Sequence, residues 1–477
     1  MRKLTVLLLV LATAVCTFAQ TGAVPKSPRA VRLTQEGLRL QENRRSYEAM
    51  QKWREAVKLD PDLALAWAML SIVETSPDAA WEAREHARLL IEGKPLVNAE
   101  DLLIRWIVSR SETDLMYSIA VANDLVEKHP EQKRILWTVG SWYGFQLHQY
   151  ARDASLQEAA IKADPTFTPA YSELAFAYAH IQLYDRAAKT IKKYLELLPN
   201  QPNSEDAYAE VMRLAGRNEE ALEHYRQALK ILPSFDSAQL GLGDTYALMG
   251  DQKSARAEYE KCVNSPMLST RLTCRKMAIY SYAREKNFDE AKRQLIDFSA
   301  QMHKIKRISL EVESLLVLGL IESDSDKAIQ YFDQAIAAAK ASKTLPPSDR
   351  EEGIARTLVH KVRVASAAGK TDVAQKAQAE LDAMGAATRD LRVDAAMHGG
   401  RGAVLFYAKK YEEAMPELQD DLGDSFSMLL LSRSFEQLGQ TDAAQVVRGL
   451  IGKQHNTEID LCMVQQELNK QQLMSKQ

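Results

Sequence analysis

Small and large apolar residues recur along this chain with a period of about 34 residues. In a frame that begins at Ala30, small residues return near positions 8 and 20, and aromatic residues return at positions 4, 11 and 24. The unit that begins at Asp236 shows the pattern, with Gly243, Tyr246, Ala255 and Tyr259. The small residues allow two helices to approach closely, and the aromatic rings fill the space around that contact. A constant period of this length predicts a stack of helix–turn–helix units.

Prolines mark the end of each unit in the first half of the chain. They are separated by 33 to 35 residues and are Pro61, Pro95, Pro130, Pro165, Pro199, Pro233 and Pro266. A proline stops the second helix of a unit and sets the direction of the chain into the next one. Inside two units, Gly216 and Gly250 are placed to close the first helix in a left-handed conformation.

These residue types in one frame resemble the tetratricopeptide repeat family. The resemblance covers nearly all of residues 30–455, clearly to Pro266 and in weaker form beyond it, where Asn287–Ala291 and Asp326–Ala328 repeat the turn-to-alanine pattern. It implies an all-α fold, a right-handed superhelical solenoid of antiparallel helix pairs. Such a solenoid grows by adding units that contact only their neighbours.

The chain is expected to divide into six segments. They are a signal peptide (1–19), a linker (20–29), a regular repeat array (30–266), degenerate repeats (267–345), a second repeat segment (346–455) and a polar capping helix with a loose tail (456–477). An open solenoid end requires such a polar cap.

The amino terminus predicts export. Arg2 and Lys3 precede an apolar run from Leu4 to Ala19, which is short for a membrane span and typical of a secretory signal peptide cleaved after Ala19. A retained anchor is the alternative. We expect a periplasmic or secreted protein with no membrane span in the mature chain.

Charge and cysteine content refine this picture. Removing Arg2 and Lys3 leaves 59 basic and 64 acidic side chains, a net charge of −5, which gives no broad electrostatic reason to bind nucleic acid. In an oxidising compartment Cys262 and Cys274 could form a disulfide across the turn at Pro266, or they could be two buried thiols. Cys462 is left over and is expected to be packed.

Catalytic motifs are missing from the sequence. It contains no HExxH, CxxC, GxSxG or GxxxxGK[ST] pattern, and the oxyanion-like run His398–Gly402 has no nucleophile elbow to serve. We therefore expect no enzyme, no cofactor and no metal.

The resemblance places ligands in the concave groove, which the family lines with residues of the first helix of each unit. The candidate partner contacts read from these positions are Trp142, Phe145, Phe176, His180, Asp206, Glu210 and Arg213. Rigid aromatic rings beside charged groups suit a peptide or a partner helix. The alternative is that the aromatic rings pack against neighbouring helices as core.

The sequence thus predicts an exported, non-enzymatic scaffold in the cell envelope that binds a protein or peptide in its groove. One alternative is a hydrolase or carbohydrate-active enzyme in the degenerate half, which a His–carboxylate cluster in a deep pocket beyond residue 267 would favour. A second alternative is a solenoid that assembles with copies of itself.

Overall fold

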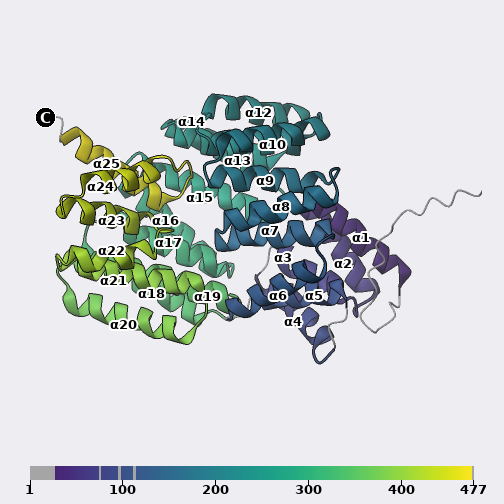
Figure 1. The fold of residues 1–477 in the computed structure, drawn as a ribbon, viewed down its shortest axis with the longest axis horizontal. Helices are drawn as coiled ribbons and strands as arrows, with labels where there is room; N and C mark the ends of the chain where they lie inside the picture. Colours follow the sequence, from purple (N-terminus) through teal and green to yellow (C-terminus); the bar gives the residue numbers. More distant parts are fainter. Residues whose placement is uncertain (1–26, 44, 75–76, 95–97, 111–113, 475–477) are drawn as a thin grey trace, which may run out of the picture.

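A computed structural model describes the chain except for residues 1–26, 44, 75–76, 95–97, 111–113 and 475–477. The expected signal peptide and most of the linker therefore lie outside the described residues. The described part forms 25 helices and no strand (Figure 1). This confirms the all-α fold.

The first seven helix pairs coincide with the regular part of the sequence pattern. Their bounds are α1 (Pro28–Glu42) and α2 (Ser46–Leu59), α3 (Ala64–Val73) and α4 (Pro77–Ile91), α5 (Ala99–Ser109) and α6 (Leu115–Lys128), α7 (Lys133–Leu147) and α8 (Tyr150–Ala163), α9 (Thr168–His180) and α10 (Tyr184–Leu197), α11 (Pro202–Leu214) and α12 (Asn218–Ile231), α13 (Asp236–Leu248) and α14 (Gln252–Cys262).

Pairs continue without interruption after Pro266. They are α15 (Leu268–Arg284) and α16 (Phe288–Lys304), α17 (Ile308–Ile321) and α18 (Ser325–Ala341), α19 (Pro347–Ala367) and α20 (Thr371–Ala387), α21 (Leu391–Tyr407) and α22 (Tyr411–Gln419), α23 (Ser425–Gln437) and α24 (Thr441–Gly452). A last, unpaired helix, α25 (Ile459–Met474), ends the described chain. The degenerate half thus has the same architecture as the regular half.

Small residues and rings meet between the two helices of a unit, as the sequence predicts. Gly243 of α13 lies directly against the ring of Tyr259 in α14, and the Tyr259 side chain is fully buried. A side chain at position 243 would occupy the space of that ring. The turn glycines also behave as expected, because Gly216 and Gly250 have φ angles of 74° and 87°, which favour glycine.

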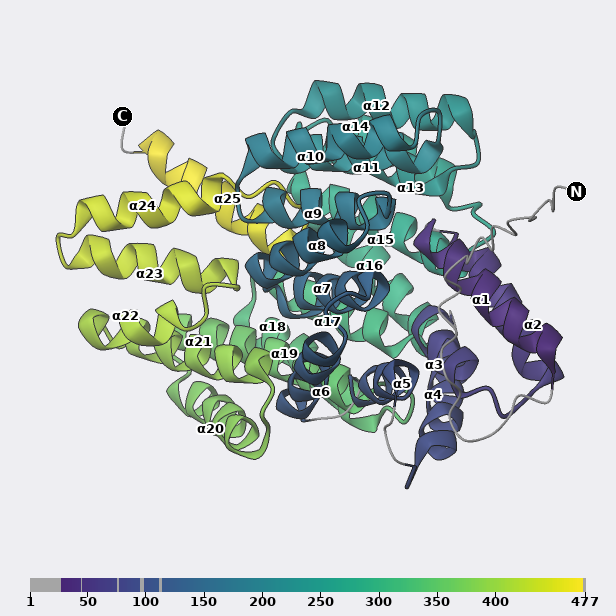
Figure 2. The same ribbon diagram turned by 45° about the vertical axis from the view of Figure 1, so that its right-hand side comes forward.

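The odd-numbered helices form the inner face of the array. Most of them contact the next odd-numbered helix directly, whereas among the described residues successive even-numbered helices make no contact of similar extent. Helices on the inside of a bend are closer together than those on the outside, so the odd helices line the concave side. The bend brings distant units together (Figures 1 and 2): the Ser348 hydroxyl at the start of α19 donates to the carbonyl of Arg110, just after α5, at 3.4 Å.

Helix α25 differs in one respect from the expected cap. It packs on α23 and α24 of the last pair, but it also reaches back to α15 (Figure 2). There the Gln466 side chain donates to the carbonyl of Arg284 at 2.9 Å. The helix therefore covers part of the inner face as well as the end of the array.

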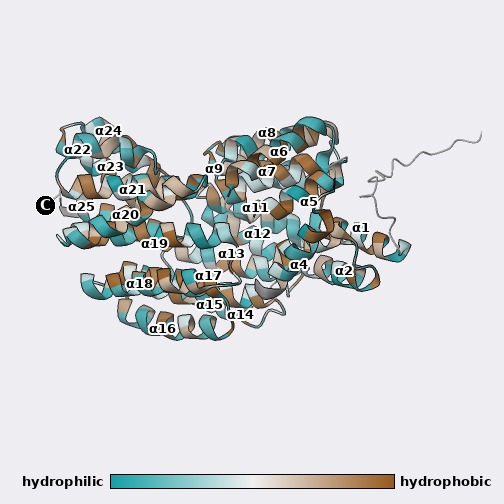
Figure 3. Cartoon of the chain, turned by 90° about the horizontal axis from the view of Figure 1, so that it is seen from below, coloured by the Kyte–Doolittle hydropathy of each residue, from teal (hydrophilic) through white to brown (hydrophobic). Residues whose placement is uncertain are grey.

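Hydrophilic and hydrophobic residues alternate along many helices (Figure 3), whereas the inner helix α17 is buried on nearly all sides. Among the described residues, none of the helices combines the length and the apolar character that a membrane crossing requires. The structure joins Cys262 and Cys274 in a disulfide with a Cα–Cα distance of 6.1 Å, between the end of α14 and the start of α15.

Candidate functional site

Trp142, the first aromatic residue predicted to contact a partner, is part of the packing between helices. Its side chain is 4% exposed and meets Trp106 of α5 edge to face, with ring centroids 5.5 Å apart. Tyr143 contacts the same indole ring at 5.1 Å. Trp142 therefore holds α7 against α5 and presents almost no surface to a ligand.

Phe145, Phe176 and His180 surround a small void between α7, α8 and α9 that is too tight to hold a water molecule and that Tyr150 and Asp153 also line. Phe145 is 52% exposed, but Phe176 is only 4% exposed. The exposed His180 ring stacks on Tyr150 with centroids 4.1 Å apart. Of the three aromatic candidates, Phe145 is the one with a free ring face.

Asp206, Glu210 and Arg213 lie on one face of α11 and belong to a paired network. The buried Asp206 accepts a hydrogen bond from the Ser237 hydroxyl at 2.9 Å, and Arg213 lies 3.7 Å from Glu210. Burial acts to lower the pKa of Arg213, but Tyr225, Asp244 and Glu210 around it raise the pKa overall. The guanidinium stays charged, so this stretch of the inner face is held together by its own charges.

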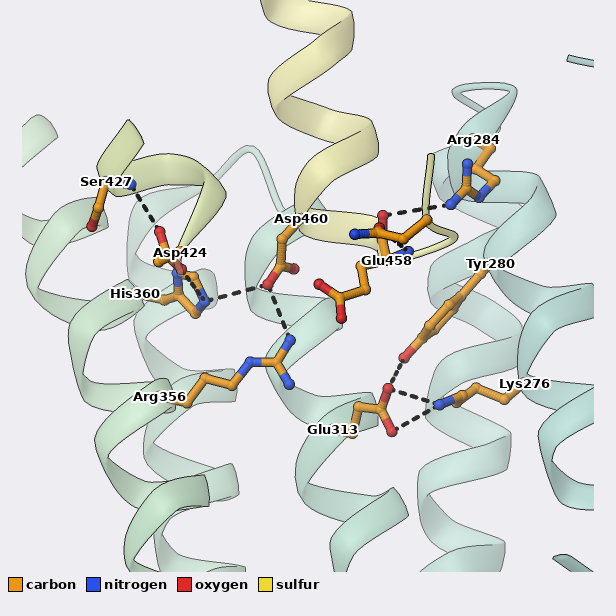
Figure 4. Close-up of polar contacts among 11 residues, drawn as sticks. Lys276, Tyr280, Arg284, Glu313, Arg356, His360, Asp424, Ser427, Glu458 and Asp460 are labelled. Carbon is orange, nitrogen blue, oxygen red and sulfur yellow. Dashed lines mark hydrogen bonds and ion pairs between the residues drawn. The ribbon is translucent and has the colours of Figure 1, made fainter. Parts of the chain in front are cut away.

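A second set of polar side chains, which the sequence analysis did not single out, lies where α25 meets α15, α17 and α19 (Figure 4). We call it the inner-face charged cluster; its members are Lys276, Tyr280, Arg284, Glu313, Arg356, Glu458 and Asp460. Lys276 Nζ lies 2.9 and 3.0 Å from the two carboxylate oxygens of Glu313. The Tyr280 hydroxyl donates to Glu313 at 3.1 Å. Helices of consecutive units are thereby tied to each other across the inner face.

The same cluster holds the segment that leads into α25. Arg356 donates from Nη2 to Asp460 Oδ2 at 3.1 Å, and Arg284 donates to the backbone carbonyl of Glu458 at 3.5 Å. Farther along the array, the Tyr184 hydroxyl donates to the carbonyl of Lys453 at 3.3 Å. Tyr184, Arg284 and Arg356, which belong to three separate units, therefore all bind the stretch from Lys453 to Asp460.

His360 lies one turn after Arg356 on α19 and is 1% exposed. Its Nε2 atom lies 3.7 Å from Asp460 Oδ2 and 3.9 Å from Asp424 Oδ2. Burial lowers the pKa of His360 to about 4, although both carboxylates act to raise it. The imidazole is therefore neutral at physiological pH.

This is a His–carboxylate cluster beyond residue 267, the feature that would favour the enzyme alternative if it opened into a pocket. Asp460 is 5% exposed and His360 is almost completely enclosed. A substrate therefore cannot come into contact with the imidazole. Arg363 also stacks on the neighbouring Phe426 ring, 3.5 Å from its centroid. The cluster is closed and does not have the form of a substrate site.

Sequence reasoning missed these residues because the proline spacing ends at Pro266 and the frame becomes hard to follow. One signal was present: Lys276, Tyr280 and Arg284 are four residues apart, as are Arg356 and His360, so each set shares one helix face. The contacts with Glu458 and Asp460 had no signal, because they join segments about 100 to 180 residues apart.

Comparisons with known proteins bear on the family. The model described as "TPR repeat" matches residues 209–250, and the model described as "Tetratricopeptide repeat" matches residues 237–265. "Superkiller complex protein 3" of Mus musculus is 28% identical over 114 residues, which is 24% of this chain and 7% of that protein. The Homo sapiens protein of the same name is 24% identical over 147 residues, 31% of this chain and 9% of its own length. The chain thus matches less than a tenth of either relative.

Two solved structures are similar to this one at low identity. The "APC/C hetero-tetramer Cut9-Hcn1" has a TM-score of 0.42 and 16% identity, covering 85% of this chain and 76% of that one. A "tetratricopeptide repeat protein from Parabacteroides merdae" has a TM-score of 0.36 and 14% identity, covering 60% and 99%.

The matched residues 209–265 run from α11 to just beyond α14, where the 34-residue frame, the turn glycines and the contact of Gly243 with Tyr259 all coincide. The same helix pairs extend through the rest of the described chain. Residues 209–265 therefore carry tetratricopeptide repeats, and the described chain on either side repeats the same helix pair.

Proposed function

We propose that this protein is an exported, non-enzymatic scaffold that binds a segment of a partner protein on the inner face of its helical array. Tetratricopeptide repeats support a role in protein interaction. The observation that carries the proposal is that the inner face already holds one peptide segment, the chain's own residues from Glu458 into α25.

The contacts with this segment support the proposal that the inner face can bind a peptide. Arg284 of the inner helix α15 donates to a main-chain carbonyl, a group that every peptide offers, and Tyr184 of α10 does the same at the edge of the array. Arg356 pairs with Asp460 and Arg433 pairs with Glu467, so carboxylate side chains are bound as well. A partner segment that carries acidic side chains fits this surface, because charge-assisted hydrogen bonds to carboxylates are stronger than neutral ones.

The aromatic part of the inner face offers a second point of contact. Phe145 is 52% exposed and lies on the surface beside His180 and Tyr150. An exposed ring on a rigid helix gives contact area at low entropic cost. We place the partner segment along a path from Phe145 toward the inner-face charged cluster.

A photo-crosslinking amino acid placed at position 145 is expected to give a discrete heavier species in cells that express the protein. The matched control is position 446, because Val446 is also exposed but belongs to α24, an outer helix. Covalent adducts are followed on denaturing gels and identified by mass spectrometry. Adducts from position 446 but none from position 145 would place the partner on the outer face.

Export is also part of the proposal, supported by the apolar amino terminus and by the bond between Cys262 and Cys274. Disulfides persist in oxidising compartments and are rare in the cytosol. The intact mass of the purified protein, measured without reduction, is expected to match a chain that begins at Gln20 and lacks two thiol hydrogens. A mass that includes Met1 and three or more free thiols would contradict export.

A further inference from the structure

Three potential metal ligands converge at the point where α25 begins. They are His360 of α19, Asp424 at the cap of α23 and Asp460 in the first turn of α25, and one ligand atom from each lies within 4.8 Å of the others. Figure 4 shows His360 lying between the two carboxylates. Each ligand comes from a different helix, so an ion bound here would join three elements.

Two atoms in this group are buried and have no hydrogen-bond partner: His360 Nε2 and Asp460 Oδ1. Nearly all buried polar groups in folded proteins are paired, so an orphaned pair at one place needs a reason. His360 Nε2 points toward both carboxylates at 3.7 and 3.9 Å, which is beyond hydrogen-bond distance. A bound cation between these atoms would satisfy both of them.

We propose that His360, Asp424 and Asp460 bind a divalent transition-metal ion of the Zn²⁺ type, which fastens the start of α25 to α19 and α23. One imidazole and two carboxylates form a three-ligand set that Zn²⁺ accepts, with a fourth position left for water. The site shares Asp460 with the inner-face charged cluster, but the proposal concerns how α25 is fastened and does not rest on partner binding.

Two of the three separations between ligand atoms are close to those of a zinc site, and all three are within 4.8 Å. Ligand atoms about 2.1 Å from a tetrahedral zinc ion lie about 3.4 Å apart. The two measured separations from His360 Nε2 exceed this by about half an ångström or less. A change of one side-chain torsion at Asp424 or Asp460 supplies that movement.

Each carboxylate is also held in place by a second contact. Asp424 accepts a hydrogen bond from the Ser427 amide at 2.8 Å through Oδ1, which leaves Oδ2 facing the histidine. Asp460 accepts from Arg356 through Oδ2, the oxygen that also lies 3.7 Å from His360 Nε2, while its buried Oδ1 has no partner. Outer contacts of this kind orient metal ligands.

Two positively charged side chains lie beside the site and would repel a metal ion. Arg356 contacts Asp460 directly, and Arg363 interacts electrostatically with Asp424 and Asp460. Because the side chain of Arg356 is 46% exposed, its guanidinium can turn into solvent when the metal enters.

The test is calorimetric titration of ZnCl₂ into the untagged full chain after treatment with a chelator. Saturable binding of one Zn²⁺ per chain is expected, and Asp424→Asn and His360→Gln should each weaken it by more than about 100-fold, beyond the 10- to 100-fold typical of outer contacts. Asp424→Asn keeps the oxygen that caps α23, so it serves if His360→Gln does not fold. Circular dichroism of each variant checks the fold.

His398→Gln is the matched control. His398 of α21 is partly exposed and has Glu417, Asp394 and Asp420 within 4.0 Å. It is therefore the place where zinc would bind adventitiously. Zinc binding is expected to be unchanged in this variant. Loss of binding in His398→Gln, unchanged binding in Asp424→Asn, or no one-to-one binding by the wild-type chain would each overturn the proposal.

Discussion

Replacing Trp142 by alanine is expected to destabilise the N-terminal half of the array by about 3–5 kcal/mol. The indole is 4% exposed and packs edge to face on Trp106, which is itself fully buried. Removing it leaves a cavity between α5 and α7 and also removes the aromatic pair. Chemical denaturation followed by circular dichroism at 222 nm measures the loss without depending on tryptophan fluorescence.

Phe145→Ala is the control for this prediction. Phe145 lies three residues farther along the same helix but is 52% exposed, so its replacement should change the free energy of unfolding by less than about 0.5 kcal/mol. The two variants separate a packing role from a binding role. A small effect of Trp142→Ala, or equal effects of both changes, would show that the inner face is packed differently from this description.

The repeat architecture was predictable because its signals are local. Pro61 to Pro266 mark the unit ends at a fixed period, and contacts such as Gly243 with Tyr259 join residues 16 apart within one unit. The left-handed glycines 216 and 250 are likewise set by the turn they close. Such features repeat, so one unit supports the interpretation of the next.

The inner face was less predictable, because one residue of helix register moves a side chain by about 100°. Trp142 and Phe176 were assigned to the groove, and the structure buries both, while Phe145 remains open. Their contact with a partner stays a prediction. Phe145 is the stronger candidate, because a partner can reach its ring without unfolding α7.

The docking of α25 had no sequence signal at all. Glu458 and Asp460 look like the start of a polar cap, and the cap does pack on α23 and α24. Its contacts with Arg284 and Arg356 depend on how the bend of the array brings separate units together. That bend is the sum of small rotations between many units, and it cannot be derived from one unit.

The second large effect is expected from Arg356→Glu. This change replaces the ion pair with Asp460 by a repulsion beside a carboxylate that is 5% exposed. Breaking a buried pair by removing one partner costs about 3–5 kcal/mol, and the 46% exposure of Arg356 reduces the expected loss to about 2 kcal/mol. This change should weaken the docking of α25 in particular, because Arg356 binds Asp460 in the first turn of that helix.

Lys361→Glu provides the matched control on the same helix. Lys361 pairs with Asp333 of α18 at 2.5 Å, so its reversal removes a charge pair that ties α19 to α18 and not to α25. Amide exchange in α25 should therefore respond to position 356 and not to position 361.

Hydrogen–deuterium exchange of α25 tests most directly that the inner face binds a peptide segment through its polar side chains. In Arg356→Glu, amides of residues 459–474 are expected to exchange about 30-fold faster than in the wild-type chain, while those of α24 keep their protection. Lys361→Glu should leave both helices unchanged. Unaltered exchange of α25 in Arg356→Glu would mean that the inner-face charged cluster does not hold the segment, and it would contradict the proposed mode of binding.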